Sequence, residues 1–356
     1  MKLFACDQCQ QTLYFENSRC VSCGATVGYV PDLARMVALR RPVEGQPGVH
    51  EIALSDYDTR RYRQCRNTIE QDACNWLVEV DGVSEYCESC ALSEIIPDLS
   101  DAANNAAWRG IEAAKRRLLY TLRALRLPVE SRAERPEQGL AFHFLKGTAD
   151  EPVITGHDGG IITLNIDEAD SAFLENMREK MGEAYRTVLG HLRHEIGHYY
   201  WDRLVANTAH HQGFRALFGD ETASYEQAIE RHYNSGPPLN WGDSFISAYA
   251  TMHPWEDWAE TWAHYLHMID TLETARSHGL TVKAPAADDP HERIATNNLA
   301  FFDFAALTAG WNAVTLLHNS LNRSMGLKDA YPFVLTARVL DKLRFVHQLV
   351  QANQGN

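Results

Sequence analysis

The distribution of cysteine is the feature that most constrains how this 356-residue chain can fold. All eight cysteines lie between Cys6 and Cys90, and the rest of the chain contains none. The first residues, MKLFACDQCQ, lack the apolar run of a signal peptide, so we expect a cytoplasmic protein. In that compartment clustered cysteines bind metal ions more often than they form disulfides. The sequence therefore predicts a metal-stabilised module that ends near residue 100.

The spacing of the cysteines indicates two metal sites. Each C-x2-C pair can place two thiolates on one ion, and two facing pairs complete a closed tetrahedral site. A redox role for a single pair would need a thioredoxin-like βαβ unit, which the pattern does not show. The sequence predicts two structural zinc sites, the first formed by Cys6, Cys9, Cys20 and Cys23 and the second by Cys65, Cys74, Cys87 and Cys90.

Hydrophobic periodicity divides the chain into three parts. Short strand-like runs such as 12–15 and 49–54 fill the cysteine-rich part, and helical and strand patterns follow it. We expect an α+β protein that is mostly helical, with a zinc-ribbon region over 1–99, a second domain over 100–280 and C-terminal helices over 281–356. The expected elements are helices over 101–127, 168–205, 254–277, 295–324 and 333–351, strands over 140–145 and 161–166, a loop-rich stretch before Pro254, and a linker over 284–290.

The charge balance argues against a nucleic-acid-binding protein. The chain has 33 Lys and Arg against 47 Asp and Glu, a net charge of −14, and the first hundred residues are also acidic. Phosphate binding needs a basic surface, so we expect the zinc ribbon to bind a protein partner if it binds one at all. No run approaches the roughly 18 apolar residues of a membrane span.

An H-E-x-x-H motif, His194-Glu195-Ile196-Gly197-His198, lies in a segment with a helical pattern. On a helix, residues i and i+4 share one face, so both imidazoles can reach one ion, and Glu195 can accept a proton from water there. Such a motif can also arise by chance on a helix with ordinary histidines. Apolar residues flank it on several sides, however, which indicates a buried helix whose polar groups need partners.

The segment 253–269 offers a third ligand. On a helix its apolar residues form one stripe, and the opposite face holds only Glu and His, without the Lys and Arg of a typical solvated face. A carboxylate is one known completion of a two-histidine zinc site. The stripe consists of Trp255, Trp258, Trp262, Leu266 and Ile269, and the opposite face of His253, Glu256, Glu260, His264 and His267.

These motifs resemble those of known zinc peptidases. Tyr249, followed by Glu256 and then by Asp-Trp-Ala-Glu, resembles a segment of the anthrax lethal factor and Mlc titration factor A type peptidases. Over nearly its whole length the chain resembles a bacterial family of zinc-binding metallopeptidases with an N-terminal zinc ribbon. The strings at 190–201 and 256–267 carry that likeness. The resemblance implies a zincin-like (gluzincin) metallopeptidase domain beside the ribbon.

The resemblance also implies roles for individual residues. It makes His194 and His198 zinc ligands, Glu256 the third ligand and Glu195 the general base. Tyr249 becomes the phenol that supports the oxyanion.

Other residues near these motifs are assigned weaker roles. Glu260, one turn after Glu256, is expected to hydrogen-bond a ligand imidazole. Asp257 and Glu260 are rival third ligands, although Asp257 points about 100° away from Glu256 on a helix. His191 lies on the same face as the motif, either beside the ligands or simply packed. Asp202, one turn beyond His198, either orients a ligand or is an ordinary surface carboxylate.

The strand-like run at 161–166 either pairs with an extended substrate or lies inside a sheet. Two functions are compatible with these features. The first is a zinc-dependent peptidase with one catalytic and two structural zinc ions, acting on a peptide or protein substrate. The alternative is an adaptor whose ribbon binds a partner and whose H-E-x-x-H site is structural, closed by an additional ligand such as His253 or His264.

Overall fold

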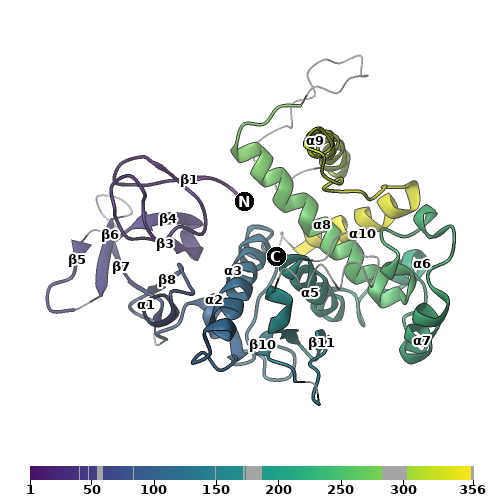
Figure 1. The fold of residues 1–356 in the computed structure, drawn as a ribbon, viewed down its shortest axis with the longest axis horizontal. Helices are drawn as coiled ribbons and strands as arrows, with labels where there is room; N and C mark the ends of the chain where they lie inside the picture. Colours follow the sequence, from purple (N-terminus) through teal and green to yellow (C-terminus); the bar gives the residue numbers. More distant parts are fainter. Residues whose placement is uncertain are drawn as a thin grey trace.

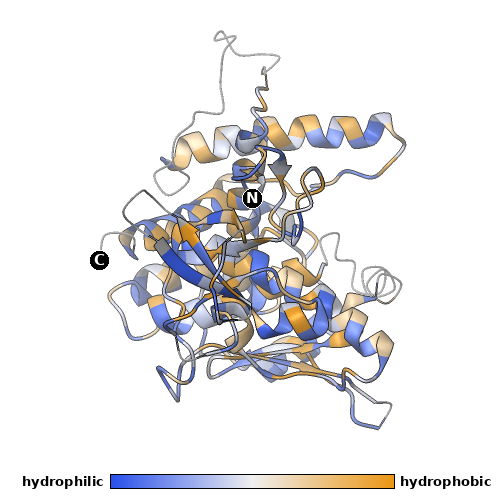
Figure 2. Ribbon diagram, turned by 90° about the vertical axis from the view of Figure 1, so that its left-hand side faces the viewer, coloured by the Kyte–Doolittle hydropathy of each residue, from blue (hydrophilic) through white to orange (hydrophobic). Residues whose placement is uncertain are grey.

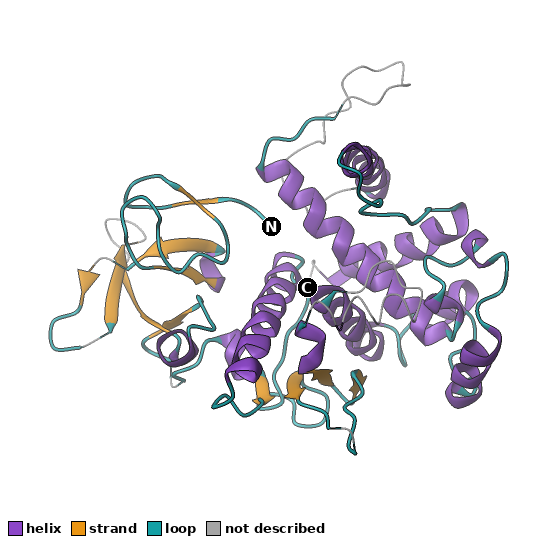
Figure 3. Cartoon of the chain, in the orientation of Figure 1, coloured by secondary structure: helices purple, strands orange, loops and turns teal. Residues whose placement is uncertain are grey.

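The computed structural model describes residues 1–39, 41–46, 48–53, 59–82, 84–148, 150–170, 173, 187–282 and 303–353. Strands dominate the N-terminal part and helices the rest, with one further small sheet beneath the helices (Figures 1 and 3). The molecule is therefore a mixed α+β protein, as the sequence predicts. Within the described residues no helix has both the length and the apolar character needed to cross a membrane, and apolar and polar segments alternate along the helices (Figure 2).

The N-terminal part consists of short antiparallel strands around the cysteines. They form two two-stranded sheets, β1–β2 and β3–β4, and a four-stranded sheet in the order β5-β6-β7-β8. The cysteine loops and the two short helices connect them. The elements are β1 (Phe4–Ala5), β2 (Thr12–Leu13), β3 (Val27–Val30), β4 (Arg35–Ala38), β5 (Arg41–Pro42), β6 (Val49–Ala53), β7 (Thr59–Gln64), α1 (Arg66–Gln71), β8 (Leu77–Glu79) and α2 (Glu88–Ala91).

Helix α3 (Ala102–Ala124) connects this part to the rest of the chain. Asp101 caps its N-terminus by accepting hydrogen bonds from the Ala103 and Asn104 amides. Beside α3 lies a sheet in the order β11-β12-β10-β9, in which β10 runs parallel to both of its neighbours and β11 is an antiparallel edge strand. Its strands are β9 (Ser93–Ile95), β10 (Ala141–Leu145), β11 (Gly156–Asp158) and β12 (Ile161–Asn165). Alternate residues of β10 and β12, such as Phe142 and Leu164, are buried in the core.

Helices α5 (Val188–Leu204) and α8 (Pro254–Ser277) pack against each other at the centre of the molecule (Figure 1). Gly197 makes their close approach possible, because a Cβ at this position would lie 3.1 Å from Ala259 Cα and from Trp262 Cβ. The indole of Trp258 donates a hydrogen bond to the Gly197 carbonyl at 2.8 Å. Gly197 of the H-E-x-x-H motif therefore packs against the Trp258 and Trp262 side of α8. His194 of the same motif contacts Glu256 and Glu260 of the Glu- and His-rich face.

The remaining helices surround this pair. The loop-rich stretch expected before Pro254 in fact contains two helices, α6 (His211–Phe218) and α7 (Tyr225–Ser235), whose short apolar repeats give little sequence signal. Helices α9 (Phe304–Ser324) and α10 (Ala337–Asn353) both contact α8. The helix expected over 168–205 corresponds to α5 at its C-terminal end. Its middle, over 174–186, and the linker expected at 284–290 lie outside the described residues.

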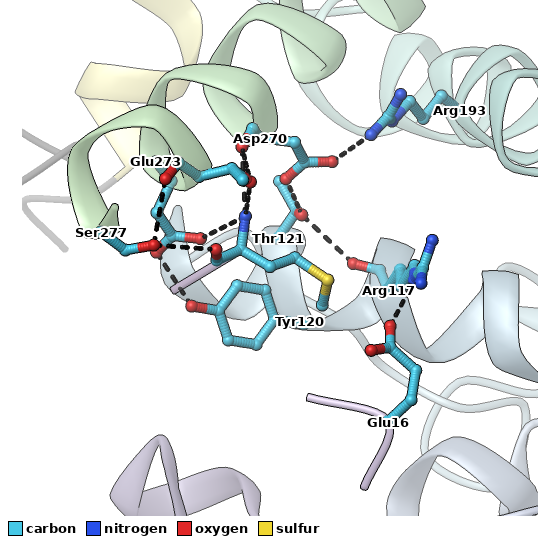
Figure 4. Close-up of polar contacts among 10 residues, drawn as sticks. Glu16, Arg117, Tyr120, Thr121, Arg193, Asp270, Glu273 and Ser277 are labelled. Atoms are coloured by element: carbon cyan, nitrogen blue, oxygen red, sulfur yellow. Dashed lines mark hydrogen bonds and ion pairs between the residues drawn. The ribbon is translucent and has the colours of Figure 1, made fainter. Parts of the chain in front are cut away.

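Side chains of α3 join the N-terminal part to the helices that carry the site (Figure 4). Arg117 of α3 forms an ion pair with Glu16 at 2.6 Å. Four residues later, Thr121 hydrogen-bonds Asp270 of α8, and Asp270 also forms an ion pair with Arg193 of α5. Because Arg193 precedes His194 in the chain, the cysteine-rich part is connected through packed polar groups to the helix that carries the motif.

Candidate metal centre

Three possible ligands converge where α5 meets α8. His194 Nε2 lies 2.9 Å from Glu256 Oε2, and His198 Nε2 lies 3.5 Å from Glu256 Oε1. One ligand atom from each of these three residues lies within 4.8 Å of the others, and all three residues are buried. The two histidines are one helical turn apart, whereas Glu256 reaches them from the other helix.

The charge and donor chemistry of this group fit a zinc ion. The described residues around the adjoining cleft of about 480 Å³ include four glutamates and neither Lys nor Arg. Burial alone would raise the pKa of Glu256, but the imidazoles of His198 and His194 outweigh it and hold the pKa well below its usual range. The carboxylate therefore stays ionised beside two imidazoles, which is a known zinc donor set.

Glu195 and Glu260 occupy different places around these ligands. Glu195 faces the cleft and is not among the converging ligand atoms. Glu260 accepts a hydrogen bond from His194 Nδ1 at 2.8 Å, and the Ser247 hydroxyl donates to its other oxygen at 2.5 Å. This contact leaves His194 Nε2 to face Glu256, which is how a carboxylate orients a metal-binding imidazole.

Asp257, a rival ligand from the sequence, points away from the centre. Its carboxylate forms a buried ion pair with Lys342 of α10 at 2.6 Å. Burial raises the pKa of Asp257 to about 7, although Lys342 opposes the shift. The structure therefore gives Asp257 a contact between α8 and α10 in place of a ligand position.

Three tyrosines line the cleft, and two of them, Tyr249 and Tyr225, contact the possible ligands. The ring of Tyr249 lies 6.0 Å from that of His194, centroid to centroid, and burial raises its pKa well above the usual range. Tyr225 of α7 donates a hydrogen bond to Glu256 Oε1 at 2.8 Å. Tyr225 could not be identified from the sequence, because α7 itself was not expected and no motif marks this residue.

His191 and Asp202, the weaker candidates, differ in their surroundings. His191 Nδ1 lies 2.6 Å from Glu168 Oε2, and its Nε2 lies 3.3 Å from Glu195 Oε1. Burial alone would lower the pKa of His191, but the two carboxylates raise it to about 9. Asp202 is exposed, and no hydrogen bond among the described residues connects it to His198.

The other histidines of the α8 face do not reach the centre. His253 caps α8 by accepting the Trp255 amide at 3.1 Å. His264 Nδ1 lies 2.8 Å from the Tyr331 hydroxyl, and burial lowers the pKa of His264 to about 4. This face is thus buried against other helices instead of being solvated, and neither histidine completes a closed site.

Residues that the sequence analysis missed form the walls of the cleft. The ring of Trp255 lies 3.9 Å from that of His198, and His157 of β11 stacks near the same imidazole at 6.3 Å. Glu168 belongs to the short helix η2 (Ile166–Ala169), which follows β12. His157 and Glu168 come from segments that are distant in the sequence and carry no metal-binding spacing, so only the tertiary fold identifies them. Trp255, expected on the apolar stripe of α8, instead lines the cleft.

Both groups of cysteines have the geometry of metal sites. Within each group one sulfur per residue lies within 4.8 Å of the others. In the first group Cys9 is exposed, whereas all four cysteines of the second are buried. Backbone N–H groups contact sulfurs of the second group, as in the contact of the Cys87 amide with Cys65 Sγ at 3.3 Å. Such donors favour thiolates, the form that binds zinc.

Comparisons with known proteins identify the family. Residues 104–349 match a family described as "Putative zinc-binding metallo-peptidase", and residues 3–101 match a zinc-ribbon domain. The chain belongs to this metallopeptidase family, which confirms the family assignment made from the sequence. The likeness to lethal factor and Mlc titration factor A stays a prediction.

Relatives are found in mycobacteria. The chain is 44% identical to uncharacterised proteins of Mycobacterium tuberculosis and Mycobacterium bovis, over 98% of this chain and 95% of theirs. No solved structure matches the chain. The family therefore supports a metallopeptidase role in general.

Proposed function

We propose that this protein is a zinc-dependent peptidase, with His194, His198 and Glu256 as the zinc ligands. The observation that carries the proposal is the convergence of these three residues at a cleft with an additional glutamate, Glu195, beside them. A purely structural site would not need that additional carboxylate. The adaptor alternative needs a closed site, and His253 and His264 are engaged elsewhere.

The chain's own residues supply the acid–base chemistry. A zinc ion held by the three ligands would act as a Lewis acid toward the scissile carbonyl and lower the pKa of water. Glu195 accepts the proton of the attacking water as the C–O bond forms. It then gives this proton to the amide nitrogen, so that the C–N bond breaks and a neutral amine leaves. The pKa of Glu195 is held below its usual value, since neighbouring imidazoles outweigh burial, so the base is ionised at neutral pH.

One phenol in the cleft supports the developing negative charge, and another holds the third ligand. Tyr249 lines the cleft beside His194 and can donate its O–H to the oxyanion. Tyr225 is engaged with Glu256 through its hydroxyl, which fixes the carboxylate of the third ligand. Glu260 fixes the ring of His194 by accepting a hydrogen bond from its Nδ1.

The edge strand β11 gives an extended substrate a place to bind. Of the two strands next to the cleft, β12 lies inside the sheet between β10 and β11, so the run at 161–166 does not present a free edge. Gly156 and His157 of β11 line the cleft, and among the strands that the structure describes β11 pairs with β12 alone. Peptide groups of a substrate can therefore add to this edge. The zinc ribbon is a proposed module for binding a protein partner.

The test uses the zinc-loaded protein and a pool of quenched fluorescent peptides of mixed sequence. We expect hydrolysis by the native protein, and a loss on the order of 10²- to 10⁴-fold for Glu195→Gln, because the amide cannot accept the proton. The control is the zinc content, which Glu195→Gln should leave unchanged. Normal turnover by this variant would reject the assignment of Glu195 as the base.

A further inference from the structure

We propose that Glu168 and His191 are positioning residues that hold the carboxylate of Glu195 in place and link it to the substrate edge of the cleft. This inference rests on the proposed function, in which Glu195 is the general base. Neither residue is a metal ligand in that proposal. Both act through Glu195.

The first link is the series Glu168–His191–Glu195, which consists of a hydrogen bond between Glu168 and His191 and an ion pair between His191 and Glu195. His191 Nδ1 lies 2.6 Å from Glu168 Oε2, and His191 Nε2 lies 3.3 Å from Glu195 Oε1. Ionised carboxylates can only accept hydrogen bonds, so both ring nitrogens of His191 donate. His191 and Glu195 are four residues apart on α5, which places them on the same face of the helix. The pair is well shielded, with 17% and 5% of the two side chains exposed.

The second link runs from Glu168 to the edge of the sheet. The hydroxyl of Thr155 donates to Glu168 Oε1 at 2.6 Å and accepts the amide of Asn165 at 3.1 Å. Thr155 directly precedes the edge strand β11 and lines the cleft. A continuous series of hydrogen bonds and one ion pair therefore leads from the strand that would pair with a substrate to the residue that would take the proton.

A base next to a metal centre needs such support. The Glu195 carboxylate is attracted toward any cation held by its neighbour His194, and a carboxylate that turned toward the ion would become a ligand. The ion pair of His191 with Oε1 opposes this rotation and keeps the carboxylate directed into the cleft. Displacing a catalytic group by about 1 Å can cost on the order of 10²-fold in rate.

The test compares three substitutions along the series with a matched control. His191→Phe keeps a planar ring and removes both donors, whereas His191→Gln keeps one donor. Glu168→Gln cannot accept from both of its partners. The control is His143→Phe on β10, because His143 also pairs with a glutamate, at 3.3 Å, and 18% of its side chain is exposed, but it does not line the cleft.

Kinetics with the peptide pool separate positioning from folding and binding. With zinc content unchanged, we expect kcat to fall about 10- to 100-fold for His191→Phe, as for other residues that support catalytic groups. The fall should be smaller for His191→Gln, KM should stay near the native value, and His143→Phe should behave like the native protein. Native kcat in a zinc-loaded His191→Phe protein would overturn the proposal and leave the peptidase function intact. If the zinc-loaded native protein hydrolyses no peptide, the proposed function fails, and this inference fails with it.

A second readout does not depend on turnover. In protein labelled with ¹⁵N-histidine, His191 should show both ring nitrogens protonated at neutral pH and a strongly deshielded Nδ1 proton. Glu168→Gln should shift this proton upfield, and His143→Phe should leave it in place. A His191 ring with a single proton in the native protein would contradict this series directly.

Discussion

The cysteine sites and the histidine–glutamate site show two different uses of metal ligands in one chain. Each cysteine group brings four sulfurs together, so an ion bound by all four would have no open position. Among the described residues, the histidine–glutamate group brings three ligand atoms together, at the wall of a cleft that also contains Glu195 and three tyrosines. Four protein ligands complete the coordination of a zinc ion and make a structural site. Three ligands leave one coordination position open, so a site with titratable residues beside it can support catalysis.

The two kinds of site also differ in how they are built. The pairs Cys6–Cys9 and Cys87–Cys90 are local, and zinc at such sites supplies folding free energy that a small module lacks. His194 and Glu256 are 62 residues apart, and only the packing of α5 on α8 brings them together. The cysteine sites help to create their fold, whereas the histidine–glutamate site depends on a fold that already exists.

After Glu195→Gln, the largest loss of activity is expected from substitution of Tyr249, whose phenol lies in the cleft. Tyr249→Phe should lower kcat on the order of 10²- to 10³-fold, because one donor to the oxyanion is lost. Zinc content should not change, since Tyr249 is not a ligand in this account. Steady-state kinetics on the peptide pool measure the effect. Tyr225→Phe serves as the comparison, and a larger fall in that variant would assign the oxyanion to Tyr225 instead.

Substitution of Glu260, which accepts a hydrogen bond from His194, should weaken zinc binding at one kind of metal site and not at the other. In Glu260→Gln the imidazole loses its charged acceptor, so the affinity of the histidine–glutamate site for zinc should fall about 10- to 100-fold. The cysteine sites should keep their zinc. Competition with a chromogenic chelator measures both in one titration. Equal zinc release from all sites would show that Glu260 supports the whole fold and not one ligand.

Acid should weaken the packing behind the histidine–glutamate site through His264. Its pKa is about 4 in the folded protein because of burial, against about 6.5 when unfolded, so the unfolded chain binds the proton first. The stabilisation is complete above pH 6.5 and is lost as the pH falls from about 6.5 to about 4. His264→Gln should reduce this fall in unfolding free energy by on the order of 1–3 kcal/mol. Urea unfolding at pH 7 and pH 5 measures the difference between variant and native protein. The same pH dependence in both would exclude His264.

The smallest effect is expected at the contact between α5 and α8. In Gly197→Ala the new methyl group meets Ala259 Cα and Trp262 Cβ at 3.1 Å, so the helices must separate slightly. Overpacking costs about 1–3 kcal/mol, and the higher helix propensity of alanine offsets about 1 kcal/mol of it. We expect a net destabilisation of about 1 kcal/mol and weaker zinc binding at the histidine–glutamate site alone. Thermal unfolding and a zinc titration measure these effects, and a change at the cysteine sites would contradict their independence.

Helices and strands with a short-range sequence pattern could be predicted from the sequence. The helix that starts at Pro254 and the strand at 161–165 have strong periodicity, and both occur as expected. From the sequence we also expected Glu260 to hydrogen-bond an imidazole of the H-E-x-x-H motif, and in the structure it accepts a hydrogen bond from His194 Nδ1.

The residues that could not be predicted depend on tertiary packing. Tyr225 reaches Glu256 from a short helix with a weak pattern, and Glu168 reaches His191 from a turn after β12. The spacing of residues in the sequence does not indicate such contacts. Similarly, the ion pair of Asp257 with Lys342 appears only when α10 is placed on α8.

The most direct test of the central claim is the zinc content per chain under reducing conditions, for the native protein and for Glu256→Ala. The account predicts about three zinc ions in the native protein, two in closed cysteine sites and one at the histidine–glutamate site. It predicts about two in Glu256→Ala, with the cysteine sites intact. The same zinc content in both proteins, with added zinc not retained, would show that Glu256 holds no ion and would contradict the peptidase proposal.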